Sequence, residues 1–203
     1  NGFLDDYSFV CEAFIALYQV TFDEEWLRLS KGLVHQVIAK FYDADRGVFF
    51  YTSSDDTALI ARKTETSDNV IPASNSSMAK VLFQLGTYLE ENNFLSISRQ
   101  LMMNMKETTL GYPTFYANWA QLMDWFIDPP YEVAIVGENA ATVRKELQQY
   151  YLPNVLILGA EQNSELTLLK DKFKATETWI YVCRNKTCGL PVKTVGEALG
   201  QIE

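Results

Sequence analysis

Residues 21–43, TFDEEWLRLSKGLVHQVIAKFYD, show the clearest helical pattern of the chain. Spacings of three or four residues place apolar side chains on one face of an α-helix. Asp23 is the predicted N-cap of this helix, because the acids that follow suit the positive end of the helix dipole. The apolar stripe consists of Trp26, Leu29, Leu33, Val37 and Phe41.

Helical patterns also surround this stretch. Residues 4–18 carry a broad apolar face, and a short turn at 21–23 would join the two helices as an antiparallel hairpin. Residues 43–54, DADRGVFFYTSS, predict a turn with a short strand-like piece. Further helices are predicted over 74–90, from about residue 93, and within 112–128, where Pro129 and Pro130 end the pattern.

The composition changes after the two prolines. YEVAIVG, NVLILG and TWIYVC predict strands at 131–137, 154–159 and 178–183, with a helix at 138–151 and a short helix at 195–202. Because a helix connects the first two strands, we expect them to be adjacent and parallel. The predicted fold is mostly α: helical hairpins in domain 1–129, followed by a small α/β subdomain at 130–203.

The net negative charge of the chain disfavours two classes of binding partner. The 203 residues carry a formal net charge of -9 and no cluster of Lys or Arg. An acidic surface repels phosphate backbones and anionic lipids, so we expect neither nucleic acid nor membrane as a partner. The first residue is Asn1 and not methionine, so we expect a piece of a longer protein.

Two polar stretches offer carboxylates at predicted helix starts. GFLDDYSF places Asp5 and Asp6 at the first helix, and residues 67–80, SDNVIPASNSSMAK, place Asp68 before another. These residues fit capping: Ser74 or Asn75 would accept from free N–H groups, and Asp68 would close an Asx-turn. They also fit a cavity in which the acids serve as general acid or base.

Other chemistry-bearing residues give weaker signals. His35 is the only histidine and has no metal-ligand spacing around it, and the turn at Gly137 has one glycine where a dinucleotide motif needs three. We therefore expect no metal and no cofactor. Cys183 and Cys188 flank a turn, and they would pair in an oxidising setting or stay free thiols in a reducing one.

Four segments together resemble a known family. These are GFLDDYSF with LYQVTFDEEWL, FYDADRGVFFYTSSD, ARKTETSDNVIPASNSSMA and IYVCRNKTCGLPV, in this order along the chain. They are similar to motifs of bacterial thioredoxin-domain-containing proteins, a family whose relatives include the spermatogenesis-associated thioredoxin-like protein of animals. The resemblance covers nearly the whole chain.

The resemblance implies a fold and a possible site. In that family a thioredoxin-like domain precedes an α/α toroid that resembles six-hairpin glycosidases and sugar 2-epimerases, so this chain would be a C-terminal, cytoplasmic part with a partial toroid. The implied sugar-binding cavity has Asp5, Asp6 and Asp68 as catalytic residues, with Tyr7 and Asn75 binding substrate. The alternative is a non-catalytic scaffold that docks the missing thioredoxin-like domain or another protein.

Overall fold

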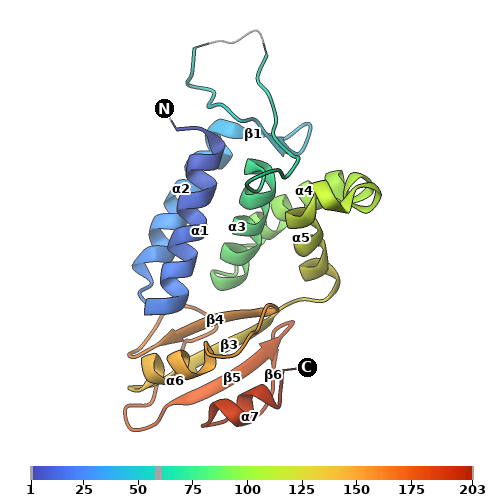
Figure 1. Ribbon diagram of the computed structural model, residues 1–203. Helices are drawn as coiled ribbons and strands as arrows, with labels where there is room; N and C mark the ends of the chain where they lie inside the picture. Colours follow the sequence, from blue (N-terminus) through green and yellow to red (C-terminus); the bar gives the residue numbers. More distant parts are fainter. Residues whose placement is uncertain (1, 58–60, 203) are drawn as a thin grey trace. The chain divides into compact units, whose positions relative to one another are not determined.

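Helical hairpins build the first part of the chain, as the apolar stripes predict. The computed structural model describes residues 2–57 and 61–202 (Figure 1). Contacts divide the chain into two units: residues 1–15 with 25–127, and residues 16–24 with 128–203. The predicted domains 1–129 and 130–203 stay a prediction.

The first hairpin consists of α1 (Leu4–Thr21) and α2 (Glu25–Phe41). Aromatic rings pair Tyr7 with Phe41 and Phe14 with Trp26, at centroid distances of 5.4 Å each. These two contacts run in opposite directions along the helices, as an antiparallel hairpin requires. Helix α2 begins two residues after Asp23, so Asp23 does not occupy the predicted N-cap position.

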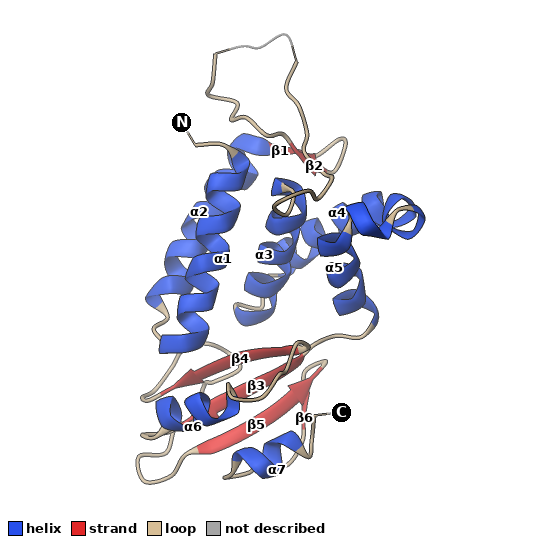
Figure 2. Ribbon diagram, viewed as in Figure 1, coloured by secondary structure: helices blue, strands red, loops and turns tan. Residues whose placement is uncertain are grey.

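A small hairpin and three longer helices complete this helical unit. Strands β1 (Tyr42–Asp43) and β2 (Val48–Phe49) are antiparallel. They lead through a long loop to α3 (Ser74–Tyr88), α4 (Asn92–Gly111), a 3-10 turn η1 (Pro113–Phe115) and α5 (Ala117–Ile127). Figure 2 shows that helices dominate this part of the chain.

Close packing joins α3 to α4. Gly86 lies where the two helices meet, and a Cβ built there would be 2.7 Å from Leu95 Cγ. No real Cβ tolerates such a contact, so the absence of a side chain allows the two helices to approach. Most of α3 is buried, including the polar residues of its first turn.

The second unit is a mixed four-stranded sheet with the order β4-β3-β5-β6. Its strands are β3 (Tyr131–Val136), β4 (Val155–Ala160), β5 (Trp179–Arg184) and β6 (Thr187–Cys188). Strands β3 and β4 are parallel neighbours joined by α6 (Ala140–Leu147), which confirms the sequence prediction. Strand β5 is antiparallel to β3.

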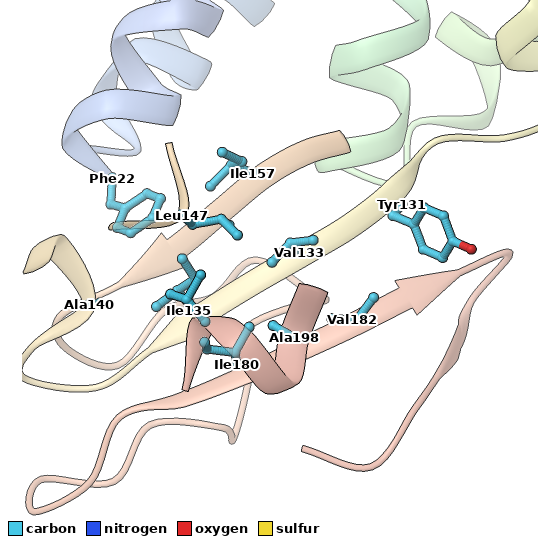
Figure 3. Packing of buried hydrophobic residues seen from close by; sticks show 11 residues of the cluster. Phe22, Tyr131, Val133, Ile135, Ala140, Leu147, Ile157, Ile180, Val182 and Ala198 are labelled. Carbon is cyan, nitrogen blue, oxygen red and sulfur yellow. The ribbon is translucent and has the colours of Figure 1, made fainter. Parts of the chain in front are cut away.

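One face of this sheet holds the core of the unit. Val133, Ile135 and Ile180 alternate along their strands and are fully buried. Residues of α6 and of α7 (Val195–Leu199) pack against them, as does Phe22 (Figure 3). Both helices therefore cover the same face of the sheet.

The turn after β3 needs glycine for a local reason. Gly137 has a φ of 141°, and a Cβ there would be 2.3 Å from the Glu177 carbonyl oxygen. The glycine therefore serves close approach of the Glu177–Thr178 backbone. In the described ranges, no helix is both long and apolar enough to cross a membrane.

Candidate functional site

Asp68 is the hub of the polar loop before α3. Its Oδ1 accepts hydrogen bonds from the Ala73 N–H at 2.9 Å and from Ser76 Oγ at 2.7 Å. Its Oδ2 accepts from the Asn118 N–H at 2.9 Å, in the first turn of α5. One carboxylate thus satisfies free donors at the starts of two helices, α3 and α5.

This arrangement corrects two predictions about the loop. The N-cap position of α3 is Ala73, without a side-chain cap, so neither Ser74 nor Asn75 caps the helix as expected. The Asx-turn that was one of the two alternatives for Asp68 is not formed either, because the carboxylate accepts from residues further along the chain. The prediction that a side chain of this loop caps the helix was correct, but the capping residue is Asp68 and not Ser74 or Asn75.

Asn75 is fully buried and holds the small hairpin in place. Its Oδ1 accepts from the Phe49 N–H at 2.8 Å, and its Nδ2 donates to the carbonyls of Phe49 and Glu65, both at 2.9 Å. The side chain therefore pairs with β2 much as a neighbouring strand would. Its predicted role in binding substrate stays a prediction, but both donors and the acceptor are already used within the chain.

A polar cluster that the sequence did not predict extends from Asp68. Lys80 Nζ donates to Asn118 Oδ1 at 2.9 Å and to Gln121 Oε1 at 2.5 Å, and Asn118 Nδ2 donates to Ser76 Oγ at 3.0 Å. Burial lowers the pKa of Lys80, while the nearby charges of Glu12 and Asp68 oppose that shift. The sequence analysis had singled out Asp68 of this cluster, and Lys80 is a charged residue among the buried residues of α3.

Glu12 on α1 interacts electrostatically with Lys80. Burial raises its pKa, and the positive charge of Lys80 acts in the opposite direction. A carboxylate and an ammonium that are both partly desolvated stabilise each other's charged forms. We name the group Glu12, Asp68, Ser76, Lys80 and Asn118 the Lys80 cluster.

The acids at the start of α1 form a separate group. Asp5 Oδ2 accepts from the Tyr51 hydroxyl at 3.0 Å, and Asp6 Oδ2 accepts from the Phe3 N–H at 2.8 Å. Burial, and then the hydrogen bond to Asp5, raise the pKa of Tyr51 to about 12. Tyr7, the predicted sugar platform, has its ring edge against Phe41.

The predicted convergence of Asp68 on the α1 acids stays a prediction. Among the described residues, no hydrogen bond or ion pair joins Asp68 to Asp5, Asp6 or Tyr7. Asp68 belongs to the Lys80 cluster, and Asp5 belongs with Tyr51. The catalytic roles proposed for the three acids stay predictions.

Two hollows lie beside these groups. One of about 410 Å³ is lined by residues 68–72 with Ala117, Asn118 and Gln121. The other, also about 410 Å³, is lined by Tyr51 and residues 63–67. Both are near the small end of the range for ligand pockets. Within the described ranges, no three His, Cys, Asp or Glu side chains are grouped to hold a metal ion.

Comparison with known proteins finds distant relatives but does not assign the chain to a family. No family model matches the chain. The chain is 25% identical to spermatogenesis-associated protein 20 of Homo sapiens over 203 residues, which cover 94% of the chain and 26% of that protein. The mouse protein of the same name is 24% identical over 94% of the chain and 26% of its own length. An uncharacterised Caenorhabditis elegans protein is 24% identical over 97% of the chain and 28% of its own length.

These relatives bear on the predicted family and source. The chain spans about a quarter of the length of each. The name spermatogenesis-associated protein 20 agrees with the predicted resemblance to thioredoxin-domain-containing proteins. All three relatives are animal proteins, and they give no support to a bacterial source.

Proposed function

We propose that the chain is a C-terminal part of a cytoplasmic thioredoxin-domain-containing protein, and that its helical unit is a non-catalytic scaffold. Similarity to the human relative over 94% of the chain supports the first half of the proposal. In this proposal the hairpins α1–α2 and α3–α4 are a section of an α/α toroid. The partner of the scaffold is the thioredoxin-like domain of the same protein.

The use of the Asp68 carboxylate carries the scaffold proposal. A general acid or base must have an oxygen within about 2.6–3.2 Å of the substrate atom that it serves. Both Asp68 oxygens already accept hydrogen bonds from the chain itself, from Ala73, Ser76 and Asn118. The carboxylate fixes two helix ends in place, which is the work of a structural residue.

The acids of α1 support the same proposal. Asp6 is exposed and accepts from the Phe3 N–H just before the helix, as acids at helix starts commonly do. Asp5 is engaged by the Tyr51 hydroxyl. Retaining glycosidases need two carboxylates about 5–5.5 Å apart across the substrate, and inverting ones about 6.5–9.5 Å. The contacts of these acids tie each of them to its own neighbours instead.

Carbohydrate binding is the second candidate, and one observation favours it. The hollow beside Asp68 combines the Asn118 and Gln121 amides with the apolar Val70 and Ile71. Sugars present hydroxyls and apolar ring faces, so such a lining would suit them. A glycosidase- or epimerase-like activity would then use Asp68, with substrate entering over the 69–72 loop.

Binding experiments separate the two candidates. The full-length protein is screened against glycans and monosaccharides, and binding of the separately produced thioredoxin-like segment to this chain is measured by calorimetry. The scaffold proposal expects association of the two pieces and no sugar bound by the wild type. A sugar that binds the wild type and is lost in Asp68→Asn, while Asp6→Asn retains it, would overturn the scaffold proposal in favour of the carbohydrate site.

A further inference from the structure

The hairpin of β5 and β6 carries a disulfide between Cys183 and Cys188. The two residues face each other in the antiparallel register, one pair before the turn. Asn185 and Lys186 form the turn with φ values of 51° and 63°. Two consecutive positive φ values are typical of the tight type I′ turn, which brings the flanking strands into close register.

The two ends of this disulfide differ in their access to solvent. Cys183 is 2% exposed, whereas Cys188 lies in the exposed run 185–191. A thiolate attacks a disulfide sulfur in line with the S–S bond, from the side opposite the leaving sulfur. Only Cys188 presents its side of the bond to solvent, so attack is directed to Cys188 and Cys183 is the leaving group.

Cations and their paired carboxylates lie along the strand that holds Cys183. Lys172 lies 4.7 Å from the Tyr181 ring centroid, and Lys193 lies 4.5 Å from that of Trp179 and pairs with Glu177. Arg184, next to Cys183, pairs with Asp128. Tyr181 and Trp179 share a face of β5 with Cys183 because side chains alternate along a strand. Because Arg184 and Lys193 are each paired with a carboxylate, the direction of attack follows from the exposure of the two cysteines and not from the charge around Cys183.

We propose that Cys183–Cys188 is a thiol–disulfide exchange site that a protein dithiol of the Cys-x-x-Cys class reduces through Cys188. A thiolate of the reductant bonds to Cys188 Sγ, and the S–S bond breaks with its electron pair on Cys183, which takes a proton from water. The second reductant thiolate then attacks the first reductant sulfur. Cys188 leaves as a thiolate and is protonated, and the reductant becomes a disulfide.

Backbone hydrogen bonds hold the fold around the site in addition to the disulfide. The Gly189 N–H donates to the Val182 carbonyl at 2.9 Å, and Ile180 and Val192 exchange two backbone hydrogen bonds of 2.8 and 2.9 Å. These bonds hold the segment after β6 to β5 in either redox state. Reduction therefore acts on the native chain, and the exchange site is independent of the proposed scaffold function.

Trapping the mixed disulfide tests the proposal. The air-oxidised chain is incubated with a thioredoxin whose second active-site cysteine is serine, and the products are alkylated, digested and mapped by mass spectrometry. We expect a covalent adduct on Cys188 with Cys183 alkylated as a free thiol. A maleimide should react at least about 10-fold faster with Cys188, the thiol left in Cys183→Ser, than with Cys183, the thiol left in Cys188→Ser. The reason is that thiol reactivity follows exposure.

Two controls assign the adduct to this disulfide in the folded chain. Both variants are made in a Cys11→Ser background, since Cys11 is a third, buried thiol. Circular dichroism before and after reduction checks that the native fold is the reacting species. Two free thiols at Cys183 and Cys188 after air oxidation, an adduct on Cys183, or no adduct at all in the folded chain would each overturn the proposal.

Discussion

Replacing Asp68 with asparagine tests whether its carboxylate holds two helix ends. Asparagine keeps one accepting oxygen, but its NH₂ group would face either the Asn118 N–H or the donors at Ala73 and Ser76. The variant also loses the negative charge beside two helix N-termini, worth about 0.3–1 kcal/mol at each. With one donor left unpaired as well, we expect Asp68→Asn to lower the free energy of unfolding by about 1–2 kcal/mol.

Alanine at the same position gives the upper bound. Removing a side-chain cap costs about 0.5–2 kcal/mol, and Asp68 serves two helices, so Asp68→Ala should cost about 1–4 kcal/mol. Urea unfolding of wild type and variants measures both values. Asp6→Asn is the matched control: its one backbone donor, Phe3 N–H, still finds an oxygen, and the change should stay within about 0.5 kcal/mol.

A double-mutant cycle isolates the contribution of one hydrogen bond of Asp68, the one from Ser76. Ser76 Oγ donates to Asp68 at 2.7 Å, so Asp68→Asn should cost less in a Ser76→Ala background than in the wild type. If Asp68→Asn unfolds at the same urea concentration as the wild type, the double-cap account is wrong. The Asp68 hydrogen bonds would then be incidental, and the main observation behind the scaffold proposal would be lost.

Two further predictions concern packing and pH. Gly86→Ala should destabilise the chain by about 1–3 kcal/mol because its Cβ would overlap Leu95. Gly32 has open space around it, so Gly32→Ala should stabilise helix α2 by about 0.5–1 kcal/mol. Thermal unfolding measures both changes, and equal shifts in the two variants would refute the packing argument. The pKa of Tyr51 is raised to about 12 from 10.0, so its proton is held more tightly in the folded state and stability should be level below pH 10 and fall as pH rises from 10 to 12. Tyr51→Phe should remove that part of the fall in pH-dependent unfolding curves, and an unchanged slope would contradict it.

The elements of secondary structure and much of their order could be predicted from the sequence. Apolar spacing of three or four residues located α2, α3 and α4, and short β-branched runs located β3 and β4. These patterns are local, because each element must bury one face or stripe wherever it ends up in the fold. The parallel pairing of β3 with β4 was also predictable, since a helix of suitable length joins them.

The contacts of the polar residues could be found only from the tertiary structure. Asp68 accepts from Asn118, fifty residues further along the chain, and Lys80 donates to the same residue, so no local pattern could reveal either partner. The sequence also left Cys183 and Cys188 either paired or free, and the register of a two-residue turn settled that they face each other. A side chain's hydrogen-bond partners depend on which elements pack together, and packing joins residues that sequence spacing keeps apart.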